Sequence, residues 1–231
     1  IRGLSIVPDD VRAESSRDMG ELDRYMRDLI AQRQDRPAGD LLTEYLARVR
    51  GGEMDENEVR AQIVALLVAG SDTTLGALTG TVSQLLTHSD QWELVVSDPE
   101  EWAPRAVSEG LRFDPVIGSL ARITTEAREF EGYDLPAGTI IAASMLTALR
   151  DPAVYADPDR FDITRDGHPR LHPIFGGGPH RCLGEVLARI ELEEALKALA
   201  RNLPHMELDG PPATLRGYGA VREITGLRVR V

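Results

Sequence analysis

The sequence is most specific at Phe175-Gly-Gly-Gly-Pro-His180-Arg-Cys182-Leu-Gly184, a stretch that runs into a helix predicted over Leu183 to Asn202. Consecutive glycines allow backbone conformations closed to other residues and let a flat ligand approach the main chain. Cys182 is then placed at a helix N-terminus, where free N–H groups and the helix dipole stabilise a thiolate. A structural cysteine after a flexible loop is the alternative, and the residues gathered around Cys182 favour a ligand site.

Outside this stretch, the sequence contains a long irregular segment and several short β-like runs. Asp151 to Gly178 is a meander rich in Pro, Asp and Gly, and a loop of this length is usually functional or disordered. Short β-like runs broken by turn residues occur at Arg122 to Thr125 and Thr139 to Ala143, and the chain ends in the strand-like Leu227 to Val231.

The first half of the chain has helical periodicity. Asp55 and Glu58 form a capping pattern at the start of a helix of some 30 residues, which at about 1.5 Å per residue crosses a whole domain. The sequence therefore predicts a mainly α-helical fold with a small β component, built on one long central helix. The apolar spacing predicts helices over Met19–Gln34, Asp40–Arg50, Asp55–His88, Asp90–Val96 and Pro99–Phe113.

Composition narrows the class of protein. The 26 Lys and Arg residues against 38 Asp and Glu residues give a formal net charge of −12, which disfavours nucleic acid and anionic membranes as partners. Cys182 is the single cysteine, so the chain forms no internal disulfide and a reducing cytoplasm is expected. A tetrahedral zinc set is not available, and the most apolar run, Ile63 to Ala69, is shorter than the roughly 20 residues that span a bilayer.

Phe175 to Gly184 resembles the haem-binding signature of the cytochromes P450, the haem-thiolate monooxygenases, in which F-G-x-G-x-x-x-C-x-G surrounds the cysteine ligand. Three more segments follow the order of that family. Ala69-Gly-Ser-Asp-Thr-Thr74 resembles its oxygen-activation motif. Glu109-Gly-Leu-Arg112 resembles its E-x-x-R pair, with Arg160 of Pro158-Asp-Arg-Phe161 as the third member, and the region from Leu149-Arg-Asp-Pro152 to His172 is similar to its meander.

The resemblance implies roles for individual residues. Cys182 is expected to ligate the iron of haem b, and His180 and Arg122 to contact the haem propionates. A local loop hydrogen bond for His180 and a plain surface position for Arg122 are the alternatives. The remaining expected cofactor contacts are Phe175, Gly176, Gly178, Gly184, Ala69 and Gly70.

Two further groups of residues follow from the same resemblance. Thr73 is expected to hydrogen-bond iron-bound dioxygen and Asp72 to relay protons, at a point where weak helix formers in mid-helix can open the backbone to water. Ordinary packing of a Ser/Thr-rich helix turn is the alternative. Glu109, Arg112 and Arg160 are expected to form a buried ion-pair cluster behind the haem.

The implied activity is insertion of one oxygen atom of O2 into a C–H bond or double bond of a hydrophobic small molecule. The thiolate favours O–O cleavage, and electrons come from NAD(P)H through a ferredoxin reductase and a ferredoxin, since no flavin or nicotinamide fingerprint is present. By analogy the substrate pocket is lined by Val64 to Ala69, Val116 to Leu120 and Ile224-Thr225.

The resemblance covers the chain only as the C-terminal half of the family domain. Residues 1–231 are then one portion of a single domain: a helical part to about 113, a β-rich and meander part over 114–182, and a helix with C-terminal strands over 183–231. An N-terminal portion is the expected further partner. A peroxygenase or dehydratase, a haem-binding sensor, a recruitment domain and an inactive fragment remain as alternatives.

Overall fold

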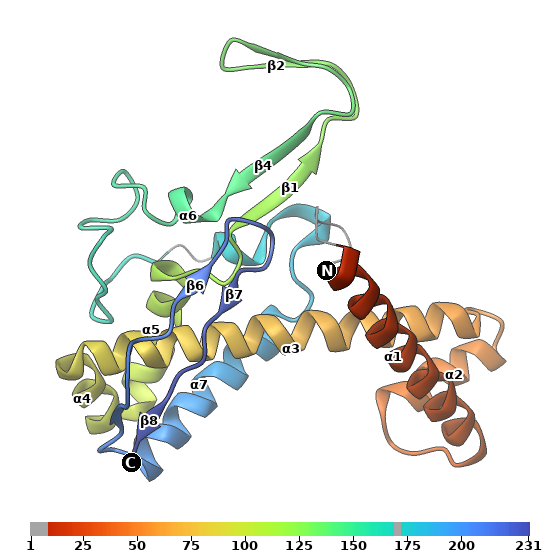
Figure 1. The fold of residues 1–231 in the computed structure, drawn as a ribbon, viewed down its shortest axis with the longest axis horizontal. Coiled ribbons are helices and arrows are strands. Elements are labelled where there is room, and N and C mark those ends of the chain that lie inside the picture. The colour runs from red at the N-terminus through yellow and green to blue at the C-terminus, as the bar shows by residue number, and fades with distance from the viewer. Residues whose placement is uncertain (1–8, 169–171) are drawn as a thin grey trace. The chain divides into compact units, whose positions relative to one another are not determined.

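The computed structural model describes residues 9–168 and 172–231 (Figure 1). The chain divides into two compact units, Ile1–Ala69 and Gly70–Val231. The boundary falls inside the long helix α3 (Glu56–Thr87), so each unit contains one part of that helix.

The first unit consists of α1 (Asp9–Asp35), α2 (Leu41–Arg50) and the first part of α3, which share a small apolar core. Helix α1 begins ten residues before the predicted start at Met19. Its first turns are exposed, so no spacing of buried positions marks them, and the helix extends there by propagation. The buried core residues of this unit are Ile30, Leu42, Leu46 and Val59.

Side-chain caps fix two helix starts in this unit. The N–H of Thr43 donates to Asp40 Oδ1 over 3.0 Å at the start of α2. The N–H of Glu58 donates to Asp55 Oδ1 (2.9 Å) while the N–H of Asp55 donates to Glu58 Oε2 (2.8 Å). The capping pattern predicted at Asp55 and Glu58 is therefore confirmed, with both orphan donors satisfied.

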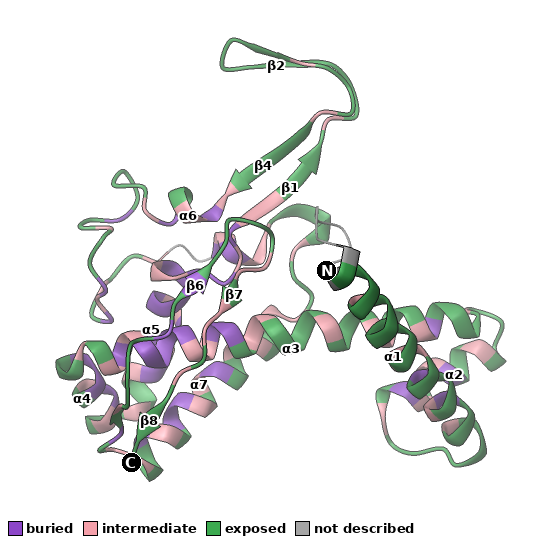
Figure 2. Ribbon diagram, viewed as in Figure 1, coloured by how far each residue is buried: buried purple, intermediate pink, exposed green. Residues whose placement is uncertain are grey.

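The second unit packs four helices around one apolar core: the later part of α3, α4 (Ser89–Ser97), α5 (Pro99–Phe113) and α7 (Glu185–Asn202). Figure 2 shows the buried positions concentrated on α5, α7 and the adjoining end of α3. Gly110 of α5 packs tightly against α3, because a Cβ there would lie 2.1 Å from Thr81 Oγ1. Only glycine fits at this crossing.

Short antiparallel strand pairs complete the second unit, and α6 (Met145–Ala148) follows the fourth strand. The β1–β4 ribbon projects from the helices and carries the β2–β3 hairpin at its far end (Figure 1). That hairpin turns at Glu131 and Gly132, whose φ values of 50° and 81° suit a primed turn. The pairs are β1 (Ser119–Ile123) with β4 (Ile140–Ser144), β2 (Arg128–Phe130) with β3 (Tyr133–Leu135), β5 (Glu207–Leu208) with β8 (Val229–Arg230), and β6 (Leu215–Arg216) with β7 (Glu223–Ile224).

The mainly helical fold with a small β component is confirmed, and α3 is its longest helix. Within residues 9–168 and 172–231, α3 is also the one helix long and apolar enough to cross a membrane by length and composition. The run from Ile63 to Ala69 is too short to span a bilayer by itself, but it lies within this longer helix. Length and composition alone are weak evidence for a membrane span, and 17% of the apolar window of α3 is buried in the structure.

Candidate functional site

The cysteine loop, residues 172–184, contains two short 3-10 helices joined by a glycine turn. The first, η2 (Pro173–Phe175), ends at Gly176, whose φ of 73° is in the left-handed region that glycine adopts without strain. The second is η3 (Gly178–His180). The N–H of Cys182 donates to the Phe175 carbonyl oxygen over 2.8 Å, which closes the loop. The Cys182 side chain is exposed.

Two arginines attach the loop to α7. Arg181 donates from Nη1 to the Gly176 carbonyl oxygen (2.5 Å) and from Nη2 to Glu185 Oε1 (2.8 Å). The guanidinium of Arg189 lies 5.1 Å from the centre of the Phe175 ring. Neither arginine is among the predicted site residues, although the four-residue steps from Arg181 through Glu185 to Arg189 are a signal that could have found them.

The segment around Cys182 is open to solvent. Gly184 is the N-cap of α7, and a Cβ there would lie 4.0 Å from Cys182 Sγ. His180, predicted as a propionate contact, is exposed at the end of η3. The thiol is therefore available to a ligand that lies over α7 and the glycine turn. The exposed apolar side chains that follow Cys182 are Leu183, Val186, Leu187 and Ile190.

Helix α3 carries the predicted pair Asp72 and Thr73, with Asp72 exposed and Thr73 half-buried. The helix assignment is uninterrupted from Glu56 to Thr87 and includes the weak helix formers around Gly70. Nothing lies within 4 Å of a Cβ built on Gly70, so a ligand can approach the helix backbone there.

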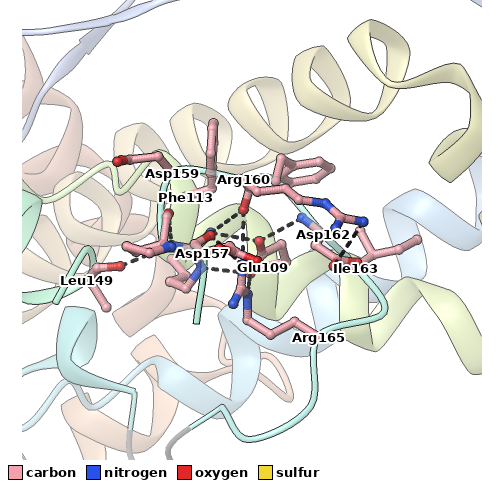
Figure 3. Close-up of polar contacts among 12 residues, drawn as sticks. Glu109, Phe113, Leu149, Asp157, Asp159, Arg160, Asp162, Ile163 and Arg165 are labelled. Carbon is pink, nitrogen blue, oxygen red and sulfur yellow. Dashed lines mark hydrogen bonds and ion pairs between the residues drawn. The ribbon is translucent and has the colours of Figure 1, made fainter. Parts of the chain in front are cut away.

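Glu109 and Arg112 form a fully buried ion pair. The Arg112 guanidinium donates to both carboxylate oxygens of Glu109 over 2.7 Å, and both side chains are 0% exposed. Arg112 also donates to the carbonyl oxygens of Leu149 (3.1 Å), Pro158 (2.7 Å) and Arg160 (2.9 Å). The pair therefore holds the meander to α5 through main-chain oxygens, as Figure 3 shows for the surrounding residues.

Arg160 is not the third cation of this cluster. Its guanidinium points to Asp162 (3.4 Å) and its side chain is 67% exposed, so it contributes only its carbonyl oxygen. Arg165, with its side chain 8% exposed, takes that place with Nε 3.4 Å from Glu109 Oε2. Arg165 also donates to the carbonyl oxygens of Asp157 and Arg160 over 3.1 Å. The prediction of Arg160 was wrong because motif spacing does not determine which arginine turns inward.

Two histidines that the sequence left without a role lie beside the cluster. His168 Nε2 is 3.5 Å from Glu109 Oε2, and its ring is 6.2 Å from that of Tyr155. His172 is 1% exposed. Burial lowers the pKa of His172 to about 3 and also lowers the pKa of His168, although the Glu109 charge opposes the shift of His168. Both rings are therefore neutral near pH 7.

Arg122 and the segments predicted to line the substrate pocket have different environments in the structure. Arg122 is exposed on β1 and donates from Nη1 to the neighbouring carbonyl oxygen of Ala121 (2.8 Å). Val116 is buried in the core of the second unit, with its Cγ2 atom 2.9 Å from a Cβ built on Gly76. Ile224 and Thr225 do line an apolar groove of about 480 Å³, together with Leu75, Leu78, Thr79, Val82, Leu199, Met206, Gly226, Leu227 and Val229.

A mainly helical fold, an exposed cysteine at a glycine turn and a buried Glu–Arg pair agree with the haem-thiolate resemblance of the sequence. The family model for cytochrome P450 matches residues 103–228, and the chain belongs to the cytochrome P450 family.

Named relatives agree with this assignment. The chain is 37% identical over 212 residues to the plant-inducible cytochrome P450-pinF1 of Rhizobium radiobacter, a match that covers 91% of this chain and 50% of the relative. It is 37% identical over 211 residues to luteothin monooxygenase of Streptomyces thioluteus, which covers 90% and 51% respectively. The tirandamycin C-bound P450 monooxygenase TamI superimposes with a TM-score of 0.86 at 30% identity, covering 95% of this chain and 55% of that structure. The chain thus spans about half the length of the relatives it matches.

Proposed function

We propose that residues 1–231 form the C-terminal portion of a single P450 catalytic domain, completed by an N-terminal portion, and that the whole is a haem-thiolate monooxygenase. The reaction inserts one atom of O2 into a C–H bond or double bond of a hydrophobic small molecule and reduces the other atom to water with two electrons and two protons. The observation that carries this proposal is the exposed Cys182 side chain at the glycine turn, in a chain whose matched relatives include a named monooxygenase.

The residues present fit a haem b group. Cys182 offers a soft sulfur ligand with no competing disulfide. Gly177 and Gly178 have nothing within 4 Å of a Cβ position, so a flat ring can approach the loop. Phe175, Gly176, Gly184, Ala69 and Gly70 would then contact the ring, and His180 and Arg122 would bind its propionates. When bound, a thiolate-ligated haem supplies O2 activation, because electron donation from the thiolate favours O–O cleavage.

Proton delivery is assigned to α3. The Thr73 hydroxyl donates a hydrogen bond to the oxygen substrate, and the Asp72 carboxylate, exposed to solvent, exchanges protons with water and supplies the two that the reaction consumes. A peroxygenase or dehydratase does not need this acid–alcohol pair, so the pair favours the monooxygenase. The Glu109 and Arg112 pair, with Arg165, has a structural role in holding the meander.

The external partners follow from the same proposal. NAD(P)H passes electrons through a ferredoxin reductase and a ferredoxin, and the single cysteine agrees with a cytoplasmic location. The substrate is apolar, because the groove that includes Ile224 and Thr225 is lined mainly by aliphatic side chains. Neither nucleic acid nor a membrane is a proposed partner of this acidic chain.

The first test is the intact mass of the purified protein together with its reduced, CO-bound absorption spectrum. A Soret band at the position of thiolate-ligated ferrous–CO haem, with a mass well above the 25.3 kDa of this chain, supports the proposal. No haem at the mass of this chain identifies an inactive fragment, and haem binding without substrate turnover identifies a sensor. The band must vanish in Cys182→Ala.

A second test separates the acid–alcohol role from packing. Thr73→Ala is expected to keep the haem and to uncouple O2 consumption from product formation. Thr87→Ala is the matched control, because Thr87 lies on the same helix and its hydroxyl donates to the Ser83 carbonyl oxygen within that helix (2.7 Å). Normal coupling in Thr73→Ala would remove Thr73 from the proposed role.

A further inference from the structure

His172 is a buried polar residue that the proposed reaction does not use. Its ring is almost fully enclosed, and a hydrogen-bonding interaction with the backbone of Ser108 raises its pKa against the larger opposing effect of burial. The ring therefore links the start of the cysteine loop to α5.

The ring of His172 also organises the start of the cysteine loop. Its Nδ1 accepts a long hydrogen bond of 3.4 Å from the N–H of Ile174, which makes His172 the side-chain N-cap of η2. The same ring lies edge-on to Phe175, with centroids 6.2 Å apart. Phe175 in turn offers the carbonyl oxygen that receives the N–H of Cys182.

The loop depends on such contacts because its own backbone is permissive. Gly176, Gly177 and Gly178 follow Phe175, and two of them have positive φ values. Beyond them, Arg181 and Arg189 hold the loop from α7. His172, the first residue of the loop, connects it to α5 through the interaction of its ring with the backbone of Ser108.

The charges around His172 agree with a neutral ring in this position. Arg189 of α7 and Arg112 of α5 face it, and His168 of the meander lies nearby, so each disfavours a proton on the ring. Glu109 is directed to Arg112, Arg165 and His168 and is not available to stabilise a second cation. A neutral ring keeps the Nδ1 lone pair free to accept from Ile174.

We propose that His172 is a positioning residue for Cys182, acting through the N-cap of η2 and the Phe175 ring to set the direction of the thiolate. The inference rests on the proposed haem-thiolate function. The contact that matters is the hydrogen bond that Nδ1 accepts from Ile174. A substituted side chain with an acceptor at the Nδ1 position should therefore preserve the loop. A side chain with an acceptor only at the Nε2 position should not.

The test compares His172→Asn, His172→Gln and His172→Leu in the complete haem-loaded protein. The amide oxygen of Asn can occupy the Nδ1 position, whereas the amide of Gln reaches the Nε2 position. We expect Leu and Gln to lower the thiolate-type fraction of the ferrous–CO Soret band by more than half and to shift the haem midpoint potential, and Asn to restore both. His205→Leu, at an exposed histidine, is the control and should leave both readings unchanged.

A readout without haem uses amide hydrogen exchange of Cys182 in the same proteins after haem removal. Loss of loop order in the Leu and Gln variants should accelerate that exchange about fivefold, the equivalent of one net hydrogen bond, while Asn keeps the wild-type rate. If the wild type lacks a thiolate band, the proposed function fails. If the wild type has the band and Leu retains both it and slow exchange, or if Gln restores them and Asn does not, the role assigned to His172 is wrong. If Leu does not fold, the Asn and Gln pair decides.

Discussion

The Glu109–Arg112 cluster and the cysteine loop lie in the same compact unit but are built in opposite ways. In the cluster, both side chains are fully enclosed, and the guanidinium of Arg112 has five described oxygen partners. In the loop, Cys182 is exposed and followed by apolar side chains in contact with solvent, of which Leu183 is 90% exposed.

This difference separates a cluster whose polar groups find partners inside the chain from a loop that is open to solvent. A buried ion pair is stable only when its polar atoms are satisfied, and the meander carbonyls satisfy Arg112. The thiol of Cys182 and the apolar side chains that follow it are not enclosed in this way. Substitutions in the cluster should therefore change stability, and substitutions in the loop should change ligand chemistry.

The largest effect is expected for Glu109→Ala. It leaves the buried guanidinium of Arg112 without its carboxylate and should lower the free energy of unfolding by about 3–5 kcal/mol. Urea denaturation followed by circular dichroism measures the change. Glu191→Ala, on an exposed position of α7, is the control and should stay within about 0.5 kcal/mol of wild type. Similar values for the two variants would contradict a buried structural cluster.

The two meander arginines provide the next comparison. Arg165→Leu should lower the free energy of unfolding by about 3 kcal/mol, because the Arg165 side chain is buried against Glu109 and donates to main-chain oxygens. Arg160→Leu should change it by less than about 1 kcal/mol, since that guanidinium forms an exposed ion pair. The same denaturation experiment applies to both. A larger loss for Arg160→Leu would reverse the assignment made from the geometry.

The pH dependence of the free energy of unfolding tests His172, the buried histidine at the start of the cysteine loop. The pKa of His172 is about 3 in the folded protein against about 6.5 when unfolded, so below pH 6.5 the unfolded state binds the extra proton and stability falls as the pH falls. Between pH 7.5 and 5.5 this amounts to about 1.4 kcal/mol, in a range where most carboxylates, with ordinary pKa values near 4, stay ionised. His172→Asn should remove this contribution to the change of the free energy of unfolding with pH, measured by urea denaturation at each pH. An unchanged slope in the variant would mean that His172 does not titrate as described.

The smallest effect on stability is expected at Cys182. Cys182→Ala should change the free energy of unfolding of the haem-free protein by less than about 0.5 kcal/mol, because the side chain is exposed and only its N–H is bonded within the loop. Urea denaturation of the haem-free protein measures this change. The ferrous–CO spectrum of the haem-loaded variant, recorded in parallel, should lack the thiolate band. A large loss of stability without haem would make Cys182 a structural residue.

Local sequence signals predicted much of the fold. Helix α5 begins at Pro99 and ends at Phe113, as its spacing predicted, because Asp98 caps it and proline suits its first turn. The two β-like runs correspond to β1 and β4 with shifts of up to three residues at either end. The exposed start of α1 was missed, since nothing buried marks it in the pattern.

The site was predicted less completely. The E-x-x-R spacing places Glu109 and Arg112 on one helix face, and the structure joins them. The exchange of Arg160 for Arg165, and the burial of His168 and His172, depend on how the meander folds back on α5 over a separation of more than fifty residues. The need for glycine at position 110 could not be predicted from the sequence either, because Thr81, the residue that leaves no room for a side chain there, lies on another helix.

Local patterns were enough to predict the helices, the glycine turn and the pairing of Glu109 with Arg112, because each depends on residues within a few positions of one another. The packed fold was needed to show that Arg165 and not Arg160 turns inward, that His172 caps η2 at the start of the cysteine loop, and that Cys182 is exposed. The burial and partners of a side chain are set by distant segments, whose packing no local pattern encodes.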